Sequence, residues 1–266
     1  MEDCGLVAAD DARLAFDGVA EIYDQVRPAY PDALLQALFA MLPPSPRILE
    51  VGPGTGQATR DLLERGAVVH AIEIGPALAA RLRSNLSSDR LQIAVGPFED
   101  VDVGAHCFDA VFSATAYHWI EPNAQTDRPA HVLKPGGLLA VVDTIQVDSS
   151  ADRGFFSASQ PIYERFGEGH TGPPAPSRDD ADPPMRLRLE ADDRYRSVEV
   201  RRYDWNQTYS ARSYRQLMLS YSGTQMMNAS DRLGLLDAIE SFIRDEFDDT
   251  VTRPLVATLT TANLVG

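Results

Sequence analysis

Three glycines with a ligand-binding spacing follow a short apolar run in the stretch RILEVGPGTG, which begins at Arg47. Gly52, Gly54 and Gly56 allow a backbone to turn tightly and to approach a ligand closely. A helix-like segment follows them, so the turn lies where a nucleotide site forms at the carboxyl end of a strand. The next apolar run ends at Glu73, whose carboxylate can accept hydrogen bonds from both hydroxyls of a ribose. Together these residues predict a site for a nucleoside-containing ligand.

Two residues near this turn indicate the charge of that ligand. A pyrophosphate is held by backbone N–H groups at a helix N-terminus, and Pro53 has no N–H to donate. Glu50 would place a negative charge close to a phosphate, which is unfavourable at short range. In one frame Gln57 also stands where the third glycine of a dinucleotide fingerprint falls. S-adenosylmethionine has no phosphate and carries a sulfonium and an amino group, so an acid beside the turn favours it.

Several longer segments resemble one family. ILEVGPGTG together with Glu73 resembles the binding signature of class I S-adenosylmethionine-dependent methyltransferases. GPFEDV, FDAVFSATAYHWI and HVLKPGGLLAVV continue the similarity, and FDGVAEIYDQVRPAYP resembles the small-molecule branch of methyltransferase type 11. The resemblance runs from about Phe16 to the end of the chain and is weakest across residues 153–193. In combination these motifs are specific for the family.

The resemblance also implies which residues hold the cofactor, S-adenosyl-L-methionine. Expected contacts are with its methionine portion, its amino group and carboxylate, its ribose and its adenine. The residues expected at the methionine portion are Glu50, Gly52, Gly54 and Gly56. The backbone of Ser113 and Ala114 should contact the amino group, and Tyr23 and Arg27 should contact the carboxylate as part of a lid. Glu73 should contact the ribose, and Ile74, Phe98 and Glu99 should contact the adenine.

The segment TAYHWI follows the fourth strand, where a methyl acceptor is expected. It supplies Tyr117, His118 and Trp119 as candidate acceptor contacts. His118 is the candidate general base because imidazole titrates near neutral pH. The alternative is a histidine that only packs or positions a group. Trp205 and Tyr221 are further candidates for the acceptor site, and each of them could equally belong to the core.

The order of elements predicts an α/β fold. From residue 47 to residue 143 short apolar runs alternate with helix-like segments, which is typical of a doubly wound, Rossmann-like parallel sheet. The resemblance implies seven strands, of which the last is antiparallel. We expect one methyltransferase domain over 1–266: an N-terminal helical lid (1–45), a cofactor-binding core (46–145), a helical insertion with a mobile loop after strand five (150–190), and C-terminal strands and helices (191–266). The loop 169–184 is either a solvated segment or a lid over the substrate.

Finer expectations concern the C-terminal part. The helix in DRLGLLDAIESFIRDEF should be capped by Ser230 or Asp231. Pro254 lies in the last strand-like run, so that strand should be at a sheet edge or begin irregularly.

Composition limits the partners. The chain has 266 residues and a formal charge of −15, which disfavours nucleic acid and anionic membranes. Its two cysteines, Cys4 and Cys107, form no metal-binding spacing, and Asp143 has no partner acids at matching strand ends, so no metal is expected. No secretory signal or membrane span is visible in the sequence. The sequence predicts a cytoplasmic protein with a small-molecule substrate and leaves its oligomeric state open.

Three functions remain at this point. The first is methyl transfer to an O, N or C atom of a small molecule, such as a natural-product intermediate. The second is S-adenosylmethionine binding without methyl transfer, as a structural or regulatory element or in a cyclisation or rearrangement. The third is a nicotinamide- or flavin-dependent oxidoreductase, against which Glu50, Pro53 and the glycine spacing argue.

Overall fold

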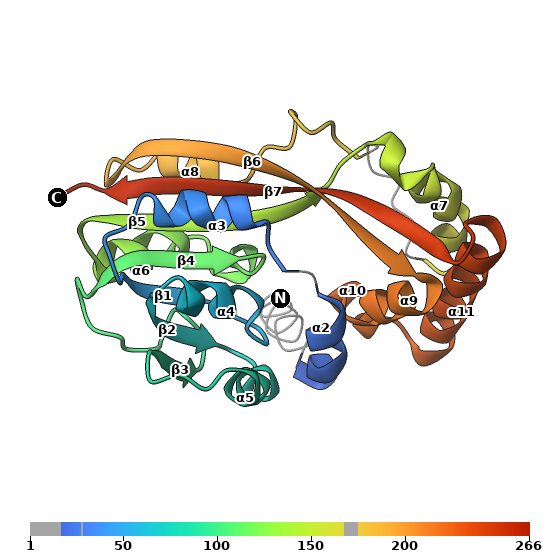
Figure 1. The fold of residues 1–266 in the computed structure, drawn as a ribbon, viewed down its shortest axis with the longest axis horizontal. Helices are drawn as coiled ribbons and strands as arrows, with labels where there is room; N and C mark the ends of the chain where they lie inside the picture. The colour runs from blue at the N-terminus through green and yellow to red at the C-terminus, as the bar shows by residue number, and fades with distance from the viewer. Residues whose placement is uncertain (1–16, 28, 168–174) are drawn as a thin grey trace, which may run out of the picture. The chain divides into compact units, whose positions relative to one another are not determined.

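A seven-stranded sheet organises the chain in the computed structural model, which describes residues 17–27, 29–167 and 175–266. The strand order is β3-β2-β1-β4-β5-β7-β6 (Figure 1). In chain order the strands are β1 (Arg47–Val51), β2 (Val68–Glu73), β3 (Leu91–Val95), β4 (Phe108–Ala114), β5 (Leu133–Gln146), β6 (Tyr195–Ser210) and β7 (Thr250–Leu264). The predicted α/β, Rossmann-like fold with seven strands and an antiparallel last strand is confirmed.

The first strands form the parallel part of the sheet that carries the glycine turn. β1 pairs in parallel with β2 and with β4, and β4 pairs in parallel with β5. Val51 lies opposite Ile72, so the residues that follow β1 and β2 emerge at the same edge. Leu49 and Val111 are fully buried, as expected for central strands covered on both faces. This register places Gly52 and Glu73 side by side.

Helices connect these strands. The helices are α2 (Ala20–Val26), α3 (Asp32–Phe39), α4 (Gln57–Glu64), α5 (Pro76–Asn85), α6 (Ala124–Val132), α7 (Phe155–Arg165), α8 (Met185–Glu190), α9 (Ala211–Leu219), α10 (Ser222–Met226) and α11 (Ala229–Glu246), with short 3-10 turns η1 (Asp17–Val19), η2 (Tyr117–Trp119) and η3 (Ser150–Asp152). Leu62 and Leu63 of α4 are buried while Glu64 is exposed, so α4 is amphipathic. Gly66 has a φ of 91° just beyond α4, which is where the sequence predicted the helix to end.

The chain divides into two compact units, each made from several segments. Of the described residues, 29–145, 182–203 and 257–266 form one, which we call the sheet unit, and 17–27, 146–167, 175–181 and 204–256 form the other, which we call the helical unit. Phe108 and Val141 belong to the core of the sheet unit. Phe155, Tyr214 and Ile239 belong to the core of the helical unit, where α9 packs against α2 and α11.

The expected cap of the helix α11 was wrong, and one of the two alternatives for the last strand is excluded. The cap of α11 is Asn228, whose side chain accepts a hydrogen bond of 3.0 Å from the backbone N–H of Asp231, so neither Ser230 nor Asp231 is the cap. β7 is not an edge strand, because it lies between β5 and β6 despite containing Pro254. In the part of the chain that the structure describes, no helix has the length and apolar character that a membrane crossing requires. Of the predicted loop 169–184, residues 169–174 lie outside the described residues, as does Phe16.

Candidate functional site

The glycine turn after β1 has a backbone that side chains would disturb. Gly52, Gly54 and Gly56 have φ values of 68°, 59° and 102°, in the left-handed region that favours glycine. A Cβ atom on Gly52 would lie only 2.4 Å from the Cβ of Ala116, which follows β4. Glycine is therefore required at position 52, because the turn after β1 contacts the segment after β4 there.

Glu50 places a buried acid beside this turn. Its side chain is 2% exposed, and its Oε2 has no hydrogen-bond partner among the residues that the structure describes. Burial raises the pKa of Glu50 from 4.5 to about 8; Thr59 opposes the rise and the charge of Glu73 adds to it. Thr59 lies close enough to have this effect, yet its hydroxyl makes no hydrogen bond of normal geometry. A buried carboxyl with an unpartnered oxygen is suited to a cationic or hydrogen-bond-donating ligand.

Glu73 is the last residue of β2, and its side chain is hydrogen-bonded to the glycine turn. Its Oε2 accepts a hydrogen bond of 2.9 Å from the N–H of Gly54, and its Oε1 accepts one of 2.9 Å from the N–H of Gly75. Each oxygen of a carboxylate can accept more than one hydrogen bond. Glu73 can therefore hold the turn and still accept from the hydroxyls of a ribose.

The end of β4 is tied to β1. Ser113 is fully buried, and its hydroxyl donates a hydrogen bond of 2.8 Å to the carbonyl of Val51. Ala114 is half-buried, and the next residue, Thr115, has a φ of 56°. The hydroxyl groups of Thr115 and Tyr30 lie 2.9 Å apart, within hydrogen-bond distance. These contacts hold the backbone of Ser113 and Ala114 at the edge that carries the glycine turn.

The three expected adenine contacts differ in their surroundings. Phe98 is 3% exposed and belongs to the core, and the guanidinium of Arg128 lies 5.6 Å from the centre of its ring. Ile74 follows β2 and is half-buried. Glu99 is also half-buried, and its Oε1 accepts a hydrogen bond of 3.0 Å from the N–H of Glu121. Ile74 and Glu99 therefore keep surface that a ligand could cover, whereas Phe98 is almost fully buried.

The residues of the TAYHWI segment divide between core and surface. Tyr117 is 1% exposed, and its hydroxyl donates a hydrogen bond of 2.7 Å to the carbonyl of Gln125. Burial raises the pKa of Tyr117 well above its usual range. The sequence suggested an acceptor contact at Tyr117, but the structure places it as a buried anchor with no surface for a ligand. His118 is exposed and Trp119 is half-buried, with ring centres 4.9 Å apart.

His118 has the protonation behaviour that a base requires. Although its side chain reaches solvent, the protein around the ring lowers the pKa of His118 below its ordinary 6.5. The imidazole is therefore neutral at pH 7 and has a lone pair with which to accept a proton.

Four of the predicted contacts lie in the helical unit. The guanidinium of Arg27 lies 4.8 Å from the ring centres of both Tyr23 and Tyr221. Trp205 is half-buried on β6, and its Nε1 donates a hydrogen bond of 3.4 Å to the side-chain oxygen of Gln207. The cofactor roles of Tyr23 and Arg27, and the acceptor roles of Trp205 and Tyr221, stay predictions.

Asp143 is a second, partly buried acid, which the sequence analysis weighed only as a possible metal ligand. It lies near the end of β5, and its Oδ2 is buried without a hydrogen-bond partner among the described residues. Burial raises the pKa of Asp143 from 3.8 to about 6. Across residues 17–27, 29–167 and 175–266, no group of three or more His, Cys, Asp or Glu side chains could hold a metal ion. In the sequence, Asp143 could be singled out because it lies near the end of a predicted strand.

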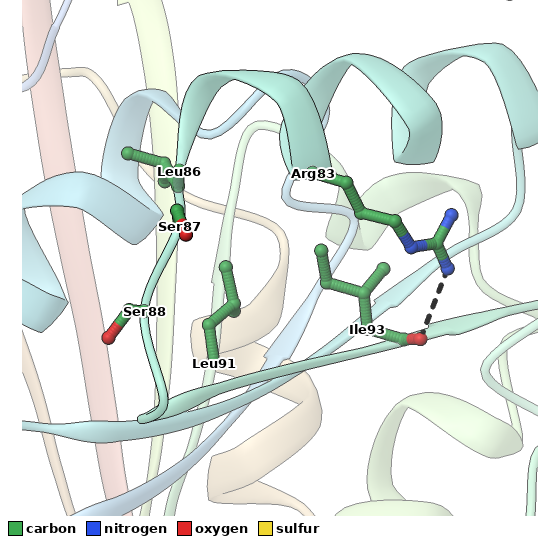
Figure 2. Close-up of a pocket in the computed structure, with 6 residues that line it drawn as sticks. All are labelled: Arg83, Leu86, Ser87, Ser88, Leu91 and Ile93. Carbon is green, nitrogen blue, oxygen red and sulfur yellow. Dashed lines mark hydrogen bonds between the residues drawn. The ribbon is translucent and has the colours of Figure 1, made fainter.

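A shallow hollow elsewhere on the sheet unit has no acidic side chain in its lining. It has a volume of about 290 Å³ and lies between the end of α5 and β3 (Figure 2). Its lining residues are Arg83, Leu86, Ser87, Ser88, Leu91 and Ile93. Arg83 donates a hydrogen bond of 3.3 Å to the carbonyl of Ile93 within this set. None of the predicted site residues lines it, so we do not assign it a ligand.

Part of the chain is similar in sequence to known methyltransferases. Residues 49–141 match the family model described as a methyltransferase domain. An uncharacterised methyltransferase of Mycobacterium bovis is 35% identical over 133 residues, which are 50% of this chain and 53% of that relative. The matched stretch thus covers about half of the relative's length.

Solved structures share the fold. A protein described as a type II methyltransferase from Anaeromyxobacter dehalogenans matches with a TM-score of 0.58 and 22% identity, over 90% of this chain and 97% of that one. Phosphoethanolamine N-methyltransferase 2 of Haemonchus contortus, in complex with S-adenosyl-L-methionine, matches with a TM-score of 0.53 and 16% identity, over 94% of this chain and 57% of that one. At these identities the likeness concerns the fold alone.

Proposed function

We propose that this chain transfers a methyl group from S-adenosyl-L-methionine to a small-molecule acceptor, since residues 49–141 match the family model described as a methyltransferase domain. The observation that carries the proposal is the buried carboxyl of Glu50 with its unpartnered oxygen beside the glycine turn. An anionic ligand would oppose this group, and a neutral hydrogen-bond donor would satisfy its oxygen without favouring its ionised form. A ligand with an ammonium and a sulfonium group compensates it, because an opposite charge favours the ionised carboxylate.

The residues at the edge of the sheet fit this cofactor. Gly52, Gly54 and Gly56 keep the backbone free of side chains where the methionine portion would lie. Glu73 would accept hydrogen bonds from the ribose hydroxyls while it holds Gly54. When bound, the cofactor supplies a methyl group attached to a sulfonium, whose departure leaves a neutral thioether.

Catalysis then depends mainly on positioning. In-line displacement requires the acceptor atom to approach the methyl carbon opposite the sulfur, and orientation alone can supply a large part of the rate enhancement. His118 would accept the proton of an O–H or N–H acceptor, since its imidazole is neutral at pH 7. Trp119 would exclude water from one side of the acceptor.

Calorimetry followed by a product assay tests the proposal. We expect the protein to bind S-adenosylhomocysteine and not NAD in isothermal titration. We also expect S-adenosylhomocysteine to form from S-adenosylmethionine when acceptors are supplied, measured by mass spectrometry. Binding of NAD alone would refute the proposal. Binding of S-adenosylmethionine without turnover on any acceptor would instead support a structural or rearranging role.

A further inference from the structure

Among the described residues, two carboxyl groups have a buried oxygen without a hydrogen-bond partner. One belongs to Glu50, which the proposed function uses, and the other belongs to Asp143 on β5. The remaining buried side-chain atoms of this kind are the hydroxyls of Thr59, Thr144 and Thr260. A charge without a partner is far more costly to bury than a hydroxyl, so Asp143 requires an explanation that the threonines do not.

Partly buried acids elsewhere in the sheet unit have cationic partners. Asp109 pairs with Lys134 at 2.6 Å and Asp192 pairs with Arg194 at 2.6 Å, and each of these two acids has a side chain that is 17% exposed. Hydrogen bonding to Arg194 lowers the pKa of Asp192 to about 2, whereas burial raises the pKa of Asp143 to about 6. Asp143 thus differs from acids in similar surroundings by having a carboxyl that is free to bind a cation.

Asp143 lies at the edge of the sheet where the candidate acceptor residues begin. Ala114 of β4 is paired with Val142 of β5, and the N–H of Thr115 donates a hydrogen bond of 2.8 Å to the carbonyl of Val142. Asp143 therefore follows β5 to a position beside Thr115. The turn η2 begins two residues after Thr115, at Tyr117.

Alternation along β5 indicates which face of the sheet carries the Asp143 side chain. Side chains two residues apart on a strand point to the same face. Val141, two residues before Asp143, belongs to the buried cluster that also contains Tyr117 and Ile120. These two residues begin and follow η2, so Asp143 lies on the face that is covered by the turn carrying His118. Because Asp143 is only half-buried, a ligand at this edge can reach it.

The strand spacing separates Asp143 from the acid proposed to face the amino group of the cofactor. Glu50 is opposite Phe112 on β4, and Phe112 is opposite Ala140 on β5. Asp143 is three residues further along β5, which is about 10 Å, and β1 and β5 are two strand spacings apart, which is also about 10 Å. Glu50 and Asp143 are therefore about 14 Å apart and cannot bind the same amino group.

We propose that Asp143 binds a positively charged amino group of the methyl acceptor, so that the acceptor is an amine. This assignment rests on the proposed methyl transfer. A carboxylate accepts charge-assisted hydrogen bonds from an ammonium group, and these are stronger than hydrogen bonds between neutral groups. The ammonium charge also favours the ionised form of the Asp143 carboxyl.

Methylation of an ammonium group requires the loss of one proton. The ammonium gives that proton to the neutral imidazole of His118, which leaves a lone pair on the nitrogen. The lone pair forms a bond to the methyl carbon while the carbon–sulfur bond breaks and its electron pair stays on sulfur. The products are a methylated ammonium ion and S-adenosylhomocysteine, and the proton on His118 passes to water. Asp143 holds the nitrogen in place throughout.

Binding of matched amines and alcohols to the 266-residue chain tests the site. The amines are benzylamine, 2-phenylethylamine and tryptamine, and the neutral counterparts are benzyl alcohol, 2-phenylethanol and tryptophol. Affinities are measured by isothermal titration at pH 7.5 and constant ionic strength, with S-adenosylhomocysteine present. We expect wild type to bind at least one amine at least tenfold more tightly than its alcohol.

Two matched variants identify the group that recognises the charge. Asp143→Asn should lose the preference for the amine over the alcohol. Asp89→Asn is the control and should keep it, because Asp89 is exposed just before β3, at the opposite edge of the sheet. Equal weakening of amine and alcohol in Asp143→Asn would indicate a structural role and overturn the proposal, as would a wild type without a preference for any of the amines.

The test does not depend on a single variant. Asparagine has the shape of aspartate and removes a charge from a partly buried position, so Asp143→Asn should fold. If circular dichroism showed that it did not, Asp143→Ser would be measured by the same ratio of affinities, with the same expected loss.

Turnover distinguishes this inference from the proposed function. With S-adenosylmethionine, wild type should convert the bound amine to its N-methyl product, detected by mass spectrometry. Asp143→Asn should have a kcat/KM at least tenfold lower and an unchanged affinity for S-adenosylhomocysteine. An amine that bound through Asp143 without being methylated would overturn its role as the acceptor.

The two proposals fail in different ways. Amine binding through Asp143 in a chain that does not bind S-adenosylhomocysteine would refute the proposed methyl transfer and leave the amine site standing. Binding of S-adenosylhomocysteine together with methylation of the alcohols alone would overturn the amine assignment and leave methyl transfer standing.

Discussion

Replacing Glu50 by glutamine should make the protein more stable at alkaline pH. The carboxyl of Glu50 is buried and its pKa is raised from 4.5 to about 8. Between these values the folded state keeps a proton that the unfolded state has released. The free energy of unfolding of wild type therefore falls as pH rises from 4.5 to 8, and the loss is complete above pH 8. Glutamine has the same shape and no charge to bury, so the variant should not lose this stability as pH rises.

The expected size follows from the shift in pKa. One pKa unit corresponds to about 1.4 kcal/mol, so the change at Glu50 corresponds to at most roughly 5 kcal/mol of unfolding free energy. Urea unfolding at several pH values between 5 and 9 measures it. Wild type and Glu50→Gln should be closest in stability near pH 5, diverge steadily as pH rises to about 8, and keep a constant difference above that. Glu64→Gln is the control, because Glu64 is exposed on the neighbouring helix α4 and its variant should follow wild type.

Ligand binding offers a second measurement of the raised pKa of Glu50. Below pH 8 the Glu50 carboxyl must lose its proton to face the ammonium group of S-adenosylhomocysteine, so binding at pH 7 should release a proton. Isothermal titration in two buffers with different ionisation enthalpies measures this release. The affinity of wild type should rise with pH up to about 8, whereas Glu50→Gln should bind weakly and without that dependence. Parallel stability curves for wild type and Glu50→Gln, or binding without proton release, would show that Glu50 is ionised in the free protein.

Three further substitutions test the remaining geometry. Gly52→Ala should abolish S-adenosylhomocysteine binding and destabilise the fold by at least about 1–3 kcal/mol, because the added Cβ meets Ala116 in a left-handed backbone; unchanged calorimetric titration would contradict the close approach. His118→Ala should lower kcat by roughly 10²–10⁴ with unchanged S-adenosylhomocysteine affinity if His118 is the base, and wild-type kcat should fall below pH 6.5 as the imidazole protonates; full turnover by the variant would exclude the role. Tyr117→Phe should cost about 1–3 kcal/mol in urea unfolding, because the buried carbonyl of Gln125 loses its donor; a variant inactive yet as stable as wild type would return Tyr117 to the acceptor site.

The sequence predicted the sheet and its glycine turn because both depend on local signals. Apolar runs of strand length, Pro76 at the start of a helix and Gly66 beyond the end of one are visible in single segments. The charge argument from Glu50 and Pro53 was also local, since it needed only residue types and their position after a strand. The family resemblance added the number of strands and the direction of the last one.

Other features depend on contacts between distant segments. Tyr117 belongs to the same short motif as His118, and only the fold shows that Tyr117 points to Gln125 in the core while His118 reaches the surface. That the Oδ2 of Asp143 has no partner among the described residues is likewise visible only in the fold, because the residues beside it lie on another strand. The cap of α11 was missed by two or three residues, because helix ends are the least certain part of a sequence-based assignment.

The contact between Gly52 and Ala116 restricts how this scaffold could be redesigned. The two positions belong to different motifs, one proposed to face the cofactor and one preceding the candidate acceptor residues, and they share a space too small for two side chains. A chimera that imported residues 113–119 from a relative to change acceptor preference would have to keep a small residue at position 116. The two motifs are therefore best exchanged as a pair, and libraries that vary the acceptor segment should begin after Ala116.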